Sequence, residues 1–82
     1  MKLPRDLSGS ELASLLRRHG YGVTRQTGSH LRLTSKAMGI EHHITIPLHR
    51  HLAPGTLSSI IADVASYLQL DRGELLQELF GG

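Results

Sequence analysis

The first quarter of the chain has leucines at the spacing of one helix face: Leu12, Leu15 and Leu16. Ser8 and Glu11 precede them in a capping-box arrangement, in which each side chain accepts a hydrogen bond from the other residue's backbone N–H. Ser10 is the rival N-cap. Gly20 is a natural stop, because glycine readily adopts the left-handed conformation that ends many helices. The pattern predicts a helix over residues 9–19.

Three short stretches then alternate between apolar and polar residues, as strands with one buried face do: 21–26, 30–34 and 43–46. Placing Val23 opposite Leu33 brings the apolar faces of the first two stretches together. This register leaves a three-residue loop at 27–29, in which Gly28 is able to take a positive φ. The stretches are therefore predicted to form an antiparallel sheet with one polar face.

The same register determines which polar residues meet across the first two strands. It sets Thr24 opposite Arg32 and Gln26 opposite His30. A loop with an even number of residues would instead put Val23 opposite Arg32, which mixes the apolar and polar faces. The odd-numbered loop is therefore the preferred hypothesis.

The rest of the chain supplies the remaining side chains of the core. In the third strand Ile44 and Ile46 are expected to point inward, and Pro47 ends the strand. Thr56 is expected to cap a helix with a regular apolar stripe: Leu57, Ile60, Ile61, Val64, Ala65 and Leu68. A last helix opens at Asp71 and carries a cluster expected to cover the core, with an exposed partner-binding strip as the alternative: Leu75, Leu76, Leu79 and Phe80.

These elements fit one small domain that spans residues 1–82. A three-stranded antiparallel sheet, covered on one face by helices, is the economical way to bury the apolar positions and leave the polar face in water. We therefore expect an α+β fold with the element order α-β-β-β-α-α.

The composition excludes several classes of protein. The 82 residues include no cysteine, which rules out a disulfide scaffold, a thiolate zinc site and a cysteine nucleophile. No segment has the apolar length of a signal peptide or of a membrane-spanning helix. The chain is expected to be soluble and cytoplasmic, with no membrane partner.

Charge is divided unevenly along the chain, although the net charge is only +2. Residues 1–50 contain eight Lys and Arg against three Asp and Glu, whereas residues 51–82 contain one against four. All six histidines lie within the first 51 residues. Such a front is typical either of a surface that meets phosphates or of an ordinary solvated face.

His30 is the strongest candidate for chemistry, because it begins a strand directly after a glycine turn and is both held and open to solvent. Imidazole groups exchange protons near neutral pH. Arg32, Lys36 and Arg50 are expected on the same surface, where their charges would hold a phosphodiester. This set of groups suits metal-free RNA cleavage, in which a base takes the 2′-hydroxyl proton and that oxygen attacks its own phosphate. A surface histidine beside a turn is the alternative.

Most of the chain resembles the HicA family of toxin ribonucleases. The resemblance is carried by residues 20–33, which contain Gly28-Ser29-His30, and by residues 45–61, which contain Gly55-Thr56-Leu57. Either element alone is a weak signal, but the two at this distance are specific as a pair. The segments 7–12 and 70–76 also fit the family.

The resemblance implies an α-β-β-β-α fold like that of double-stranded-RNA-binding domains, which agrees with the order read from the pattern. It implies the toxin of a type II toxin–antitoxin system, a nuclease that cleaves mRNA and inhibits translation without a required metal or other cofactor. The functional histidine of the family corresponds to His30. The implied partners are mRNA and a HicB-like antitoxin that blocks the toxin.

One departure from the family bears on where RNA binds. The second helix of the family is often basic, whereas residues 57–71 contain no Lys or Arg. RNA contacts are therefore expected mainly from the strands and from the loop at 47–52. The candidate contacts are Arg25, Arg32, Arg50 and, in the loop at 35–41, Lys36. Gln26 is a further candidate contact that would orient His30.

Other interpretations stay open at this point. Four histidines have a spacing that could ligate a metal, although ordinary polar loop residues are the simpler explanation: His42, His43, His49 and His51. Ser29 is an unfavourable nucleophile, because neighbouring residues on a strand point in different directions. The same fold could also serve as an RNA-binding module without catalysis, or as an antitoxin-binding domain whose nuclease activity has decayed.

Overall fold

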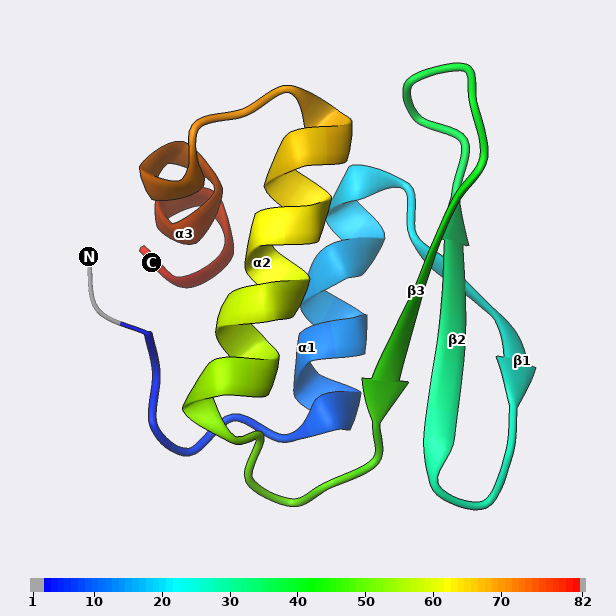
Figure 1. Cartoon of the computed structure of the whole chain (residues 1–82), viewed down its shortest axis with the longest axis vertical. Helices are drawn as coiled ribbons and strands as arrows, with labels where there is room; N and C mark the ends of the chain where they lie inside the picture. Colours follow the sequence, from blue (N-terminus) through cyan, green and yellow to red (C-terminus); the bar gives the residue numbers. More distant parts are fainter. Residues whose placement is uncertain (1–2, 82) are drawn as a thin grey trace.

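The computed structural model of the chain describes residues 3–81. In chain order its elements are α1 (Gly9–Leu16), the 3₁₀ turn η1 (Arg17–His19), β1 (Gly22–Gln26), β2 (His30–Ser35), β3 (His42–Pro47), α2 (Pro54–Leu68) and α3 (Arg72–Phe80). The strands form one antiparallel sheet in the order β1-β2-β3, and the helices lie to one side of it (Figure 1). The predicted α+β fold and its element order are confirmed.

One core lies between the sheet and the helices. Its fully buried apolar side chains come from every layer: Leu12, Leu16, Tyr21, Leu33, Ile46, Leu57, Ile61, Val64 and Leu75. The predicted C-terminal cluster is also core, since its three leucines are buried and Phe80 packs against them. The opposite face of the sheet stays open to solvent. None of the helices among residues 3–81 is long and apolar enough to cross a membrane.

The helix ends follow local chemistry. α1 and α3 begin with capping boxes that join two side chains each: Ser8 with Glu11, and Asp71 with Glu74. Gly20 has a φ of 83° and ends the first helical segment, as predicted. The predicted cap at Thr56 is wrong, because α2 begins at Pro54 with Ala53 as its N-cap. Proline suits the first helical position, since its φ is already helical and its missing N–H has no partner to lose there.

The sheet register is partly as predicted. Val23 lies opposite Leu33, but the residue opposite Arg32 is Arg25 and not Thr24. The cause is a β-bulge between Val23 and Arg25, which leaves Thr24 as an extra residue in β1. A bulge changes which side chains share a face beyond it, so the predicted pairing of Thr24 with Arg32 is wrong.

The bulge also moves Gln26. This residue pairs with Leu31 instead of His30, and it borders a groove between α1 and β1. A shift of one residue transfers a side chain to the other face of a sheet, so Gln26 shares the helix-facing side with Leu31. The connection at 27–29 has the predicted length. Gly28, however, does not adopt the positive φ that its position allowed.

The loop after β3 is fixed to the rest of the molecule. Three backbone N–H···O=C hydrogen bonds hold it: Leu48 to Ser29 at 2.8 Å, Leu52 to Leu7 at 2.8 Å, and Gly9 to His49 at 3.0 Å. The loop at 48–52 is therefore clamped between the start of α1 and the turn that precedes β2. Its exposed residue Arg50 projects from an anchored backbone.

Candidate functional site

His30 is the first residue of β2, and its side chain is exposed. The turn before it is closed by two hydrogen bonds. The Thr27 N–H donates to the His30 carbonyl over 3.0 Å, and the His30 N–H donates to Thr27 Oγ1 over 3.1 Å. The ring therefore stands on a fixed backbone where solvent reaches it, which is the setting that the sequence predicts.

His30 also borders a hollow between β3 and the start of α2. The other residues that line it are Thr45, Pro47, Gly55, Thr56, Ser59 and Ile60. The N-cap of α2 makes no side-chain hydrogen bond, so the N–H groups of the first turn receive no cap from Ala53. Hydroxyl groups and helix N-terminal amides both favour anions. The surroundings of the ring are thus polar and compatible with a phosphate.

A groove on the open face of the sheet carries paired positive charge. It is lined by Gly20, Gly22, Thr24, Arg25, Arg32, Thr34, Lys36, Glu41 and His43. Arg25 and Arg32 lie directly opposite each other on β1 and β2. Within residues 3–81, neither guanidinium has a carboxylate oxygen within 4.0 Å. Lys36, in contrast, does have a carboxylate partner, since its Nζ lies 3.6 Å from Glu41 Oε1.

The arginine pair destabilises the sheet locally. Like charges at directly opposed strand positions destabilise a sheet, by an amount on the order of 0.2–1 kcal/mol. The bulge creates this pair, since Arg25 would not face Arg32 without it. An anion between the two guanidinium groups would offset the repulsion, and the planar donors of arginine match phosphate oxygens in pairs. The groove is therefore chemically suited to a phosphate group.

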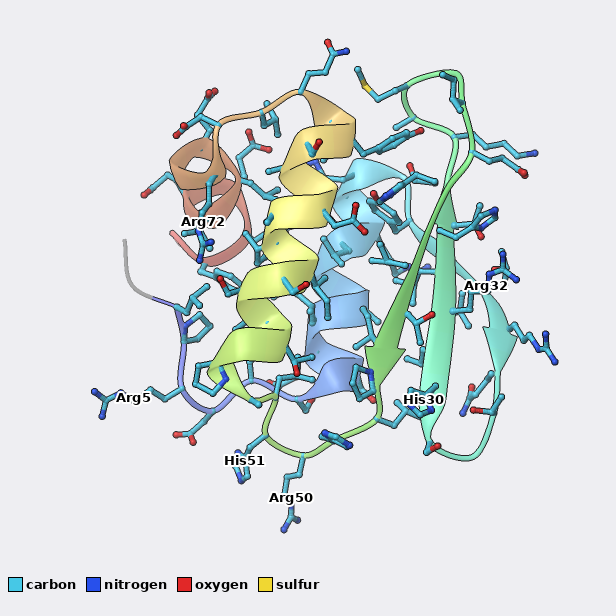
Figure 2. All side chains as sticks on the ribbon, in the orientation of Figure 1. Arg5, His30, Arg32, Arg50, His51 and Arg72 are labelled. Carbon is cyan, nitrogen blue, oxygen red and sulfur yellow. The ribbon has the colours of Figure 1, made fainter. Side chains whose placement is uncertain are left out.

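The remaining predicted site residues divide into two groups. Figure 2 shows Arg50 at the end of the molecule where His30 lies, with Arg32 further along the sheet. In this view His30 stands between the two arginines. Lys36 lines the sheet groove at the far end of β2, whereas Gln26 lies on the opposite face of the sheet. His30 and the four cationic residues are thus all exposed, but only Arg25, Arg32 and Lys36 share the sheet groove, while His30 lines a separate hollow.

Most of the other histidines have protein partners. Thr34 Oγ1 lies 2.8 Å from His43 Nδ1, and Asp6 Oδ1 lies 3.6 Å from His51 Nδ1. His19 Nε2 is 3.3 Å from a carboxylate oxygen of Glu78 on α3. Over residues 3–81, no three His, Asp or Glu side chains come together in a way that could hold a metal ion.

A hydrogen-bonded chain that runs from the core to the surface was not foreseen from the sequence. The Tyr21 hydroxyl lies 2.6 Å from His42 Nδ1, and His42 Nε2 lies 3.1 Å from Asp63 Oδ1. Burial, with the nearby Asp63 carboxylate and Tyr67, raises the pKa of the Tyr21 hydroxyl well above its usual value. Tyr21 therefore stays protonated and donates to His42, whose other nitrogen donates to Asp63. The chain joins β3 to α2 and runs from the buried Tyr21 to the exposed Asp63.

Ser29 is a second residue whose part in the site was missed. Its Oγ lies 2.9 Å from His30 Nδ1. The expectation that these two side chains point in different directions is wrong, because Ser29 belongs to the turn and only His30 belongs to the strand. The sequence signal that could have found it is a hydroxyl residue in the last turn position before a strand histidine.

The fold and the site together define a small α+β domain with an exposed histidine at the start of β2 and, on the open sheet face, a groove that holds two opposed arginines. The chain belongs to the HicA family: the family described as HicA toxin of bacterial toxin-antitoxin matches residues 9–65. The matched segment contains α1, the whole sheet and most of α2, and α3 lies outside it. The chain is therefore a toxin of a toxin–antitoxin system, for which the family implies a cognate antitoxin. No curated protein and no solved structure matches it.

Proposed function

We propose that this toxin is an endoribonuclease that cleaves mRNA without a metal ion and so inhibits translation, with His30 as its acid/base group. The observation that carries the proposal is the placement of His30. Its ring is exposed on an anchored backbone, two residues before Arg32 on the same strand, in a chain of the HicA family. The cell compartment that holds mRNA and ribosomes, the cytoplasm, is the place where such a toxin would act.

In the proposed reaction the RNA supplies its own nucleophile. His30 takes the proton of a 2′-hydroxyl, and the 2′-oxygen forms a bond to the adjacent phosphorus. The bond from phosphorus to the 5′-oxygen of the next nucleotide breaks, and that oxygen is protonated from solvent. His30 returns its proton to solvent after the products leave. Neighbouring cations stabilise the extra negative charge on the phosphorane-like transition state.

The cationic residues provide phosphate contacts on both sides of His30. Arg25 and Arg32, opposed in the sheet groove, would share one phosphate of the RNA. Arg50 would contact RNA beyond His30, from the clamped loop. Lys36 would make a weaker contact, because Glu41 already offsets its charge. No RNA contact is proposed for Gln26, since it lies on the opposite face.

Incubation of the purified protein with matched RNA and DNA oligonucleotides in excess EDTA tests the proposed function. Cleavage of RNA alone is expected, because DNA lacks the 2′-hydroxyl that the reaction needs. RNA binding without cleavage would instead support the alternative, a non-catalytic RNA-binding module. Activity that disappears with EDTA would contradict a metal-free reaction.

The double substitution Arg25→Gln and Arg32→Gln is expected to weaken RNA binding by about ten- to a hundred-fold at low salt, since it removes charge-assisted hydrogen bonds to phosphate. The slope of log affinity against log salt should become shallower by about 1.4, which is roughly 0.7 for each lost contact to a single strand. Stability should hold or rise slightly, because the like-charge pair is relieved. Fluorescence anisotropy titrations at several salt concentrations, with thermal melts, measure both effects.

Arg72→Gln is the matched control for loss of a positive charge. Arg72 lies on α3, on the far side of the molecule from Arg32 in Figure 2. It should leave the affinity and the salt slope close to those of the unchanged protein. Because Arg72→Gln removes one charge and the double substitution two, a control effect of half the size or more would show that only net charge matters, and would contradict a phosphate site between Arg25 and Arg32.

A further inference from the structure

The contact between Ser29 and His30 involves only one of the two ring nitrogens. Ser29 Oγ lies 2.9 Å from Nδ1, on the side of the ring next to the turn. Within residues 3–81, Nε2 of His30 has no hydrogen-bond partner. The ring is thus held through Nδ1, and Nε2 is the nitrogen that a substrate can reach.

The position of the Ser29 hydroxyl is set by the backbone on both sides. The Leu48 N–H donates to the Ser29 carbonyl over 2.8 Å, which ties Ser29 to the clamped loop after β3. His30 is tied to Thr27 by two further hydrogen bonds of 3.0 and 3.1 Å. Because both backbones are fixed, little entropy is lost when the hydroxyl meets the ring.

A histidine that removes a proton through Nε2 must carry its own proton on Nδ1. Once Nε2 has taken the substrate proton, both nitrogens carry one. In both forms the Nδ1–H can donate to Ser29 Oγ, so the same hydrogen bond is kept through the whole proton cycle. A serine hydroxyl can also donate, and donation to Nδ1 would leave the ring proton on Nε2; only with Ser29 as the acceptor does the hydrogen bond persist when the ring is protonated.

We propose that Ser29 is a positioning residue that keeps the proton of neutral His30 on Nδ1 and so leaves the lone pair of Nε2 facing the RNA. This inference rests on the proposed ribonuclease function for its effect on rate. The tautomer itself is a property of the free protein and is measurable without any substrate.

The same distance would also suit a serine nucleophile activated by a histidine base. The two roles differ in their consequences. A serine nucleophile would form a covalent bond to phosphorus without help from a 2′-hydroxyl, so it would cleave DNA, and removal of its oxygen would abolish the reaction. A positioning serine acts only on a substrate that brings its own nucleophile, and its removal leaves a slower reaction.

The test compares the unchanged protein with Ser29→Ala and Ser29→Thr. We expect Ser29→Ala to lower kcat for RNA cleavage by about ten-fold with little change in KM, which corresponds to a hydrogen bond to a charged group weakened by its exposure. Ser29→Thr keeps the hydroxyl and should restore most of the rate. Complete loss of activity in Ser29→Ala, with cleavage of DNA by the unchanged protein, would overturn the proposal in favour of a nucleophile.

Ring nitrogen NMR of the free protein gives a second, substrate-independent result. At a pH where His30 is neutral, the unchanged protein and Ser29→Thr should show the proton on Nδ1, and Ser29→Ala should show a shift toward the Nε2–H form. Identical spectra for all three proteins would overturn the proposal. If the spectra change as expected but the unchanged protein cleaves no RNA, the tautomer assignment is supported and the ribonuclease function alone fails.

Discussion

Replacement of His30 by alanine is expected to lower the rate of RNA cleavage by about 10²–10⁴-fold, which is the usual contribution of a general acid/base group. Expression of the variant should then cause neither growth arrest nor loss of mRNA. The fold should not suffer, because the ring is exposed and the backbone hydrogen bonds of the turn do not involve it. Single-turnover cleavage of a labelled RNA, with a thermal melt of each protein, measures both properties.

His51→Ala is the matched control for the loss of an exposed imidazole. His51 lies on the clamped loop, where its nearest charged partner is Asp6. Its removal should leave cleavage close to that of the unchanged protein, and the stability within about 0.5 kcal/mol. A His30→Ala protein that keeps more than a tenth of the cleavage rate would contradict the assignment of His30. A large loss of cleavage rate with His51→Ala would instead implicate the histidines of the clamped loop in the reaction.

Replacement of Gly9 by alanine is expected to destabilise the fold by about 3 kcal/mol, which for a domain of this size lowers the melting temperature by roughly 10–25 °C. A Cβ atom at this position would lie only 2.0 Å from the carbonyl oxygen of Pro47. Because the obstacle is backbone, it cannot turn aside as a flexible side chain would. α1 would have to separate from β3, and the hydrogen bond from Gly9 to His49 would be lost.

Gly28→Ala provides the comparison for this effect. A Cβ at Gly28 meets no atom within 4 Å, and its φ lies outside the left-handed region. Alanine restricts the unfolded chain, so the substitution should leave the free energy of unfolding unchanged or raise it by up to about 1 kcal/mol. The melting temperature should stay the same or rise accordingly. Equal melting temperatures for Gly9→Ala and the unchanged protein would show that the close approach of α1 to β3 is not required.

The secondary structure could be predicted because it depends on short-range periodicity. Leucine spacing in α1 and strict alternation in β2 and β3 decide their buried faces locally, and the capping boxes need only four residues. The bulge in β1 could not be predicted in this way. Thr24 in an extra position gains a 2.9 Å contact between its hydroxyl and that of Thr34, which no alternation pattern reveals. The paired arginines of the groove follow from that one irregularity.

The candidate site likewise combines features that the local sequence predicts with features that only the tertiary fold creates. The position of His30 at a strand start after a turn was readable from the sequence, as was the exposure of Arg32 beside it. The link from Tyr21 through His42 to Asp63 was not, because each pair is 21 residues apart and meets only through the tertiary fold. Ser29 was misjudged for a different reason: strand alternation was applied to a residue that lies in the turn.

The chemistry at one phosphodiester bond tests the central claim most directly. An RNA oligonucleotide and a copy with a single 2′-deoxynucleotide on the 5′ side of the scissile bond would be incubated with the purified protein in excess EDTA, and the early products weighed by mass spectrometry. A His30-dependent, metal-free ribonuclease should leave a 2′,3′-cyclic phosphate on the RNA fragment and should not cut the substituted bond. Cleavage of the substituted bond, or early products that lack the cyclic phosphate, would contradict the proposed reaction.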